Sequence, residues 1–183
     1  MSTLSRFTNN DLPDHFAHQI RDFIRIHWFD IFQYDVHAHA IGEDLKPVYF
    51  VMTDEPALFS HAAAVTRSVE CNGQTYSCGG LSAVLTYPAF RKRGYASQTV
   101  QAATGYLETA SLDLALLWTD PDKEHFYSRF GWEHPPSIRI LTGSQESPEV
   151  YDAFTMIHFL SNRSRQQRTD FLSHPIYIGE HSW

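Results

Sequence analysis

The chain has 183 residues, of which 43% are hydrophobic and 19% charged, and its formal net charge is -7. This length suits one domain with a sizeable core, so we expect residues 1–183 to form a single domain. The negative charge argues against nucleic-acid binding and mildly favours a cationic or neutral substrate. No run is long enough to span a bilayer, and the N-terminus carries no secretory signal, so we expect a cytoplasmic protein without a membrane partner.

The first half of the chain predicts one helix followed by a strand hairpin. Residues 11–28 follow helical spacing, with Asp11 as the expected cap and Pro13 in the first turn. Residues 29–45 carry no clean period. Strands are expected at Val48–Thr53, Phe59–Glu70 and Thr75–Thr86, and Asn72 with Gly73 predicts the turn between the last two.

The two cysteines of the chain lie in this hairpin. With Asn72 and Gly73 at the turn, Cys71 and Cys78 are separated by four residue pairs, or about 13 Å at ~3.3 Å per residue. That distance is too long for a disulfide bond. We therefore expect two buried free thiols.

The second half predicts a helix after residue 97 and then a buried strand at Leu112–Trp118, where the apolar run is nearly continuous. A short helix should open at Pro121, with Asp120 as its cap, and end before Gly131. Further strands are expected at Ser137–Leu141 and Ala153–Leu160, with a loop at 143–150 and a solvated polar segment at 161–168. This order of elements predicts an α/β (α+β) fold with a mixed sheet.

The segment TYPAFRKRGYAS, residues 86–97, gathers positive charge in an acidic chain. Arg91–Arg93 stand directly before Gly94 and Ala96, where the next helix begins. Unpaired amides and partial positive charge at a helix start attract phosphate, and small residues let the backbone come close. The segment therefore predicts a pyrophosphate cradle of backbone amides supported by arginines. A simple strand-to-helix turn with surface arginines is the alternative, and the segment has neither a dinucleotide fingerprint nor a P-loop.

Two motifs resemble those of the GNAT superfamily of N-acetyltransferases. Residues 88–97 look like its acetyl-CoA signature, Arg/Gln-x-x-Gly-x-Gly/Ala, and residues 126–132, FYSRFGW, look like its second motif. The resemblance covers about residues 48–141. It implies a mostly antiparallel sheet with splayed central strands, flanked by helices, and acetyl-CoA as cosubstrate.

The resemblance also implies roles for individual residues. The backbone around Val84 would pair with the pantetheine arm and polarise the thioester carbonyl. Tyr127 would protonate the departing thiolate, which suits a phenol that is neutral at pH 7; the alternative for Tyr127 is an aromatic residue of the core. The residues expected to hold the cofactor are Val84, Leu85, Thr86, Arg91, Lys92, Arg93, Gly94, Tyr95, Ala96 and Ser97.

A narrower resemblance is to the aminoglycoside 2′-N-acetyltransferases. It rests on HAAAV from His61, on Cys78 with Gly79, on Gly131 with Trp132, and on the final GEHSW, residues 179–183. It implies a cationic acceptor bound by acidic residues, with the tail folded toward the active site. The residues expected around the acceptor are Asp35, Ser82, Ala83, Trp118, Asp152 and Glu180.

One departure from that pattern concerns the general base. Ser82 stands where those enzymes carry a strand glutamate, and a hydroxyl is a poor base at pH 7. Glu180, His181, the Trp183 carboxylate and His61 are candidate replacements, although His61 tied into a strand is the favoured interpretation. We expect Trp183 and Tyr127 to be catalytic.

The predicted reaction is transfer of an acetyl group from acetyl-CoA to a primary amine of a small cationic acceptor by direct attack. No His-Asp pair is evident beside Cys78, so no acyl-enzyme is expected. His37 and His39 lack a third ligand, so no metal site is expected. The alternatives are another small amine, a protein N-terminus, or a non-catalytic CoA-binding sensor domain, and the sequence leaves a homodimer open.

Overall fold

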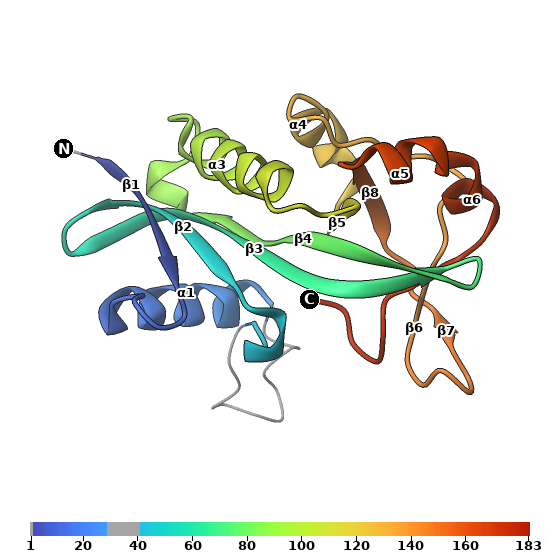
Figure 1. Cartoon of the computed structure of the whole chain (residues 1–183). Coiled ribbons are helices and arrows are strands. Elements are labelled where there is room, and N and C mark those ends of the chain that lie inside the picture. The colour runs from blue at the N-terminus through green and yellow to red at the C-terminus, as the bar shows by residue number, and fades with distance from the viewer. Residues whose placement is uncertain (1, 29–40) are drawn as a thin grey trace. The chain divides into compact units, whose positions relative to one another are not determined.

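The structure is a computed structural model that describes residues 2–28 and 41–183 (Figure 1). The chain divides into two compact units, unit 1 with residues 1–65 and 81–104, and unit 2 with residues 66–80 and 105–183. The long strands β3 (Ala57–Cys71) and β4 (Gln74–Thr86) contribute residues to both units. The predicted fold class is confirmed, because the sheet is mixed, mostly antiparallel and flanked by helices.

Unit 1 is built on antiparallel strands. β1 (Thr3–Thr8) pairs with β2 (Val48–Asp54), and β2 pairs with the first part of β3. Figure 1 shows α1 (Asp14–His27) on one side of these strands and the start of α3 (Tyr95–Thr109) on the other. The apolar stripe that α1 buries consists of Phe16, Ile20, Phe23 and Ile24.

The start of the chain differs from the prediction. Residues 3–8 form β1, which the sequence did not indicate because this edge strand is mostly exposed and only Ser5 and Phe7 are partly covered. The cap prediction for α1 was wrong as well. The Asp11 carboxylate accepts a hydrogen bond from Thr8 Oγ1 at 2.6 Å, so it closes the turn after β1, and Pro13 occupies the N-cap position without a side-chain hydrogen bond.

Unit 2 contains a sheet in the order β7-β6-β9-β3-β4-β5-β8. β4 and β5 are parallel, as are β6 and β9, and the other pairs recorded for this unit are antiparallel. The recorded β4–β5 ladder ends at Gly80 and Leu116, although both strands run on beyond those residues. The strands not yet defined are β5 (Leu114–Thr119), β6 (Ile140–Thr142), β7 (Glu149–Val150), β8 (Phe154–Phe159) and β9 (Ile176–Tyr177).

Short helices complete both units. Unit 1 has the 3-10 turns η1 (Glu43–Leu45) and η2 (Pro88–Phe90). In unit 2, η3 (Pro121–Lys123) leads into α4 (Glu124–Ser128), so the predicted short helix is confirmed, although Asp120 occupies its N-cap without a side-chain hydrogen bond. Within residues 161–168, α5 (Asn162–Gln166) is followed by the start of α6 (Arg168–Ser173), and both helices come after β8.

The β3–β4 hairpin is the one that the sequence predicted. Asn72 and Gly73 both have positive φ angles, 48° and 70°, as expected for a tight hairpin turn. Cys71 and Cys78 are buried and free, which confirms the prediction of unpaired thiols. Both thiols pack in the core of unit 2 with Tyr76, Phe171 and Ile176.

Candidate functional site

The 86–97 segment of unit 1 forms a strand-to-helix turn with unusual backbone angles. After β4 and η2, Lys92 and Gly94 take φ angles of 61° and 79°, and α3 begins at Tyr95. Glycine tolerates such angles without the strain that a Cβ adds. No heavy atom lies within 4 Å of the position that a Cβ on Gly94 would occupy. The backbone at Gly94 therefore borders open space, as a ligand-binding turn requires.

The amides of this turn are available for an anion. Gln98 N donates to Gly94 O at 3.1 Å and opens the helix, so the amides of Tyr95, Ala96 and Ser97 precede the intrahelical ladder. In the part of the chain that the structure describes, no backbone carbonyl accepts from Lys92 or from its neighbour Arg93. This group of amides lies at the positive end of the α3 dipole.

The arginine side chains of the segment are exposed and partly engaged. Arg91 Nε donates to Thr86 O at 3.1 Å, and the Arg93 guanidinium lies 5.5 Å from the Phe90 ring centroid. Among residues 2–28 and 41–183, no carboxylate forms an ion pair with either arginine. Guanidinium N–H groups without a carboxylate partner are suited to charge-assisted hydrogen bonds with an anion.

A buried hydroxyl network that sequence analysis missed connects this turn to β3. Ser60 Oγ donates to Leu85 O at 2.7 Å and lies 2.8 Å from Thr86 Oγ1 and 3.4 Å from Thr99 Oγ1. Thr99 in turn donates to the Ala96 carbonyl at 3.1 Å. The network joins the end of β4 to the first turn of α3. The network is recognisable only because Ser60 is buried, and the burial of a single serine cannot be inferred from the sequence.

His61 fixes the backbone of β4 just before the predicted cofactor strand. Its Nδ1 donates to Ala83 O at 2.7 Å, where Ala83 has a φ angle of 47°. Burial lowers the pKa of His61 to about 4, so the ring is neutral at pH 7 and Nδ1 carries the proton. The structural interpretation of His61 is therefore confirmed, and a group so hard to protonate is a poor general base. Ser82, Ala83 and Val84 themselves are half-buried.

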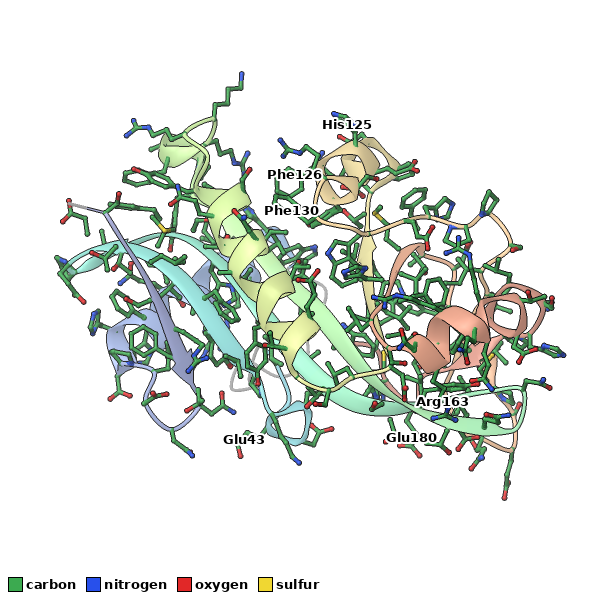
Figure 2. The ribbon with its side chains drawn as sticks, turned by 45° about the horizontal axis from the view of Figure 1, so that its top comes forward. Glu43, His125, Phe126, Phe130, Arg163 and Glu180 are labelled. Atoms are coloured by element: carbon green, nitrogen blue, oxygen red, sulfur yellow. The ribbon has the colours of Figure 1, made fainter. Side chains whose placement is uncertain are left out.

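Tyr127 is buried on α4 in unit 2, at 8% relative exposure. Burial raises its pKa to about 12, and a hydrogen bond with the Thr119 side chain acts in the opposite direction. The phenol is therefore protonated at neutral pH. Figure 2 shows Phe126 of α4 close to Phe130, which follows the end of the helix, and their ring centroids are 5.6 Å apart.

The tail after β9 carries Glu180, expected near the acceptor, and Trp183, expected to be catalytic. The Trp183 ring packs edge-on against Trp118 of β5, with centroids 4.2 Å apart. Glu180 and Asp152 are exposed, and neither has an ion pair recorded among the described residues. Unit 2 thus brings together Trp118 and Trp183, while Ser82 and Ala83 belong to unit 1.

Two predictions fall on residues outside the described ranges. Asp35 and the pair His37 and His39 lie between residues 29 and 40. Within residues 2–28 and 41–183, no group of three His, Cys, Asp or Glu side chains is placed to hold a metal ion. No helix in those ranges is long and apolar enough to cross a membrane.

The acetyltransferase (GNAT) domain family matches residues 32–134, more than half of the chain. No curated protein matches the sequence significantly. Many solved structures share this fold, and three of them illustrate the likeness. The first is a probable N-acyltransferase of Enterococcus faecalis V583, with 17% identity and a TM-score of 0.59 over 76% of this chain and 33% of that one. This chain thus spans about a third of that protein's length.

The second is a GNAT family N-acetyltransferase (YhbS) of Escherichia coli, solved in complex with CoA. It has 17% identity and a TM-score of 0.57, over 99% of this chain and 91% of that one. The third is a GNAT family acetyltransferase of Brucella melitensis in complex with acetyl-CoA, with 18% identity and a TM-score of 0.53 over 73% and 83% of the two chains. At these identities the likeness concerns the fold alone.

Proposed function

The chain belongs to the acetyltransferase (GNAT) domain family, and we propose that residues 1–183 form one domain that transfers an acetyl group from acetyl-CoA to a primary amine. The observation that carries this proposal is the 86–97 segment. Its free amides, positive φ angles and open space at Gly94 suit a pyrophosphate. Relatives of the same fold are solved with CoA and with acetyl-CoA.

The cofactor contacts follow from this segment. Amides of residues 92–97 would hold the pyrophosphate, and the exposed guanidinium groups of Arg91 and Arg93 would add charge-assisted hydrogen bonds. The backbone of Val84 to Thr86 would pair with the pantetheine arm. His61 and Ser60 would act only by holding that backbone in place.

The chemical step needs no covalent enzyme intermediate. The neutral amine attacks the thioester carbonyl carbon, a C–N bond forms, the C–S bond breaks, and the amine loses a proton as the sulfur gains one. Tyr127 would stabilise the sulfur as it becomes a thiolate. Its pKa of about 12 keeps the phenol protonated at pH 7, so it can hydrogen-bond the sulfur, and a solvent proton completes the CoA thiol.

The finer proposal is a small acceptor whose amine arrives as a cationic ammonium group, a feature that it would share with the acceptors of the aminoglycoside 2′-N-acetyltransferases. The net charge of -7 supports it, and so do the exposed carboxylates Asp152 and Glu180 of unit 2. Figure 2 shows Glu180 at the side of unit 2 away from Phe126. A carboxylate there would attract the ammonium form of the acceptor, which then loses a proton to become the attacking amine.

The test of the cofactor proposal compares two glycines. Gly73 and Gly94 share a positive φ angle and open space around a Cβ, so Gly94→Ala and Gly73→Ala carry the same backbone strain. Calorimetry should show acetyl-CoA binding to the natural protein and to Gly73→Ala, and at least about tenfold weaker binding to Gly94→Ala. No CoA binding to the natural protein at millimolar concentration would remove the proposal. Release of free thiol with an amine panel would distinguish a transferase from a binding domain.

A further inference from the structure

Three side chains of unit 2 each carry a buried N–H group for which the described residues provide no acceptor. Trp183 contacts Trp118, and the Arg67 guanidinium carbon lies 5.6 Å from the centroid of the Trp183 ring. Nε1 of both indoles and Nε of Arg67 are buried and, within the described ranges, have no hydrogen-bond partner. We call Arg67, Trp118 and Trp183 the donor cluster.

The donor cluster is held in place by the protein itself. Arg67 Nη1 donates to His181 O at 2.6 Å, and Gly179, at a φ angle of 94°, lies so close that a Cβ there would collide with Nη2. On its other side the tail is tied to β6, because Gly179 O accepts from Thr142 Oγ1 at 2.9 Å and from Gly143 N at 3.1 Å. The donors are therefore oriented before any ligand arrives.

The chemistry of the donor cluster selects a partner rich in oxygen acceptors. A buried donor without a partner costs about 1–3 kcal/mol, so three together are expensive unless something else accepts from them. No carboxylate forms an ion pair with Arg67 among the described residues. A carboxylate offers the negative charge and the lone pairs that a guanidinium and two indoles require.

The position of the donor cluster relates it to the reaction. Trp118 directly precedes Thr119, whose side chain hydrogen-bonds the Tyr127 phenol. Neighbouring residues of a strand face opposite sides, so the donor cluster and Tyr127 lie on opposite faces at the same end of β5. Figure 1 shows the same separation, with α4 on one side of β5 and the end of the chain on the other. With the leaving sulfur near Tyr127, the acceptor would come from the side of the donor cluster.

We propose that Arg67, Trp118 and Trp183 bind a carboxylate of the acceptor, so that the acceptor is an amino acid or a similar small molecule carrying both an amine and a carboxylate. This inference rests on the proposed function. The exposed carboxylates of Asp152 and Glu180 complete the arrangement. Asp152 directly follows Tyr151, which packs against the Trp118 ring, and Glu180 directly follows Gly179, which lies against Arg67. The ammonium group of the acceptor would meet these carboxylates, and its carboxylate would meet the donor cluster.

Matched acceptors test the inference on the natural protein. Thiol release is measured with L-lysine against cadaverine, L-phenylalanine against phenethylamine, and kanamycin as a polyamine without a carboxylate. We expect kcat/KM at least about tenfold higher for a carboxylate member than for its decarboxylated partner. Equal or faster turnover of the decarboxylated amines or of kanamycin overturns the inference. So does CoA binding without turnover of any carboxylate acceptor, whereas absent CoA binding removes the proposed function itself.

Substitutions locate the preference. Trp118→Phe and Trp183→Phe keep the aromatic ring and delete one N–H, and each should reduce the ratio of kcat/KM between carboxylate and decarboxylated acceptors by about threefold to tenfold. Arg67→Gln should reduce it by about tenfold or more. If Arg67→Gln fails to fold, the two tryptophan variants still decide the result.

The matched control is Arg163, which is labelled in Figure 2. It also lies over an aromatic ring of unit 2, with its guanidinium carbon 4.2 Å from the Tyr76 ring centroid. Unlike Arg67, it has a carboxylate partner, Asp113, at 3.5 Å. Arg163→Gln should leave the carboxylate preference unchanged. A ratio that falls equally in Arg163→Gln and Arg67→Gln contradicts the assignment.

Discussion

The 86–97 segment of unit 1 and the donor cluster of unit 2 assemble their functional groups in different ways. The segment is contiguous, and its contacts come from backbone amides whose geometry depends on local angles at Lys92 and Gly94. The donor cluster collects side chains from β3, β5 and the tail. If both proposals hold, cofactor binding depends on local conformation and acceptor recognition on long-range packing, and the two should respond to different mutations.

The largest expected effect concerns His61, which holds β4 beside the 86–97 segment. Its folded-state pKa, about 4, is below the ordinary value of 6.5. Between these pH values His61 is protonated in the unfolded chain and neutral in the folded chain. The free energy of unfolding should therefore fall as the pH drops from 6.5 toward 4, by on the order of 3 kcal/mol in total. Above pH 6.5 the residue should contribute no pH dependence.

Urea unfolding at pH 7 and at pH 4.5 measures this effect. His61→Leu should show a shallower loss of stability between the two pH values than the natural protein. The control His18→Gln, at an exposed site on α1 of the same unit, should keep the natural slope. Equal slopes in His61→Leu and the natural protein would contradict the burial of a neutral His61.

Tyr127→Phe separates chemistry from cofactor binding. Loss of the phenol should lower kcat by about a hundredfold, because the developing thiolate loses its donor, while the affinity for CoA stays within about twofold. Tyr76→Phe removes another phenol of unit 2, one that donates to Gln167, and should leave kcat unchanged. Steady-state thiol release and calorimetry give the two values. An unchanged kcat in Tyr127→Phe would show that Tyr127 does not stabilise the leaving thiolate.

Ser60→Ala tests whether the hydroxyl network supports the 86–97 segment. The change leaves the buried Leu85 carbonyl and the Thr86 hydroxyl without their common partner, so the free energy of unfolding should fall by about 2 kcal/mol. CoA affinity should fall as well, since the start of α3 is no longer tied to β4. Thr109→Val, which deletes an exposed hydroxyl at the other end of α3, serves as the control. Weakening of CoA binding in both variants alike would argue against a specific network.

The smallest expected effect is at the tail. Thr142→Val removes the hydroxyl that binds Gly179 O, at a cost of about 1 kcal/mol, and should loosen residues around the donor cluster. Hydrogen exchange at the Ile178 amide, which donates to Leu141 O, should become faster, while CoA affinity stays unchanged. Altered CoA affinity without faster exchange would break the proposed separation between cofactor and acceptor recognition.

Much of the fold was predictable because it follows local rules. Asn72 and Gly73 specify a tight turn, and the apolar run before Trp118 specifies a buried strand; both are confirmed. β1 escaped prediction because an exposed edge strand carries little hydrophobic alternation. Asp11 was predicted to cap α1, but its carboxylate instead accepts a hydrogen bond from Thr8 in the turn after β1.

The sequence by itself determined the family, the fold class and the proposed cofactor segment, since all three depend on residues adjacent in the chain. Tertiary structure alone brought Arg67 and Trp118 against Trp183 and, among residues 2–28 and 41–183, left one N–H group of each without an acceptor. Likewise, burial rather than residue type sets the pKa values of His61 and Tyr127. Desolvation and donor satisfaction depend on what surrounds an atom in space, and chain neighbours do not specify those surroundings.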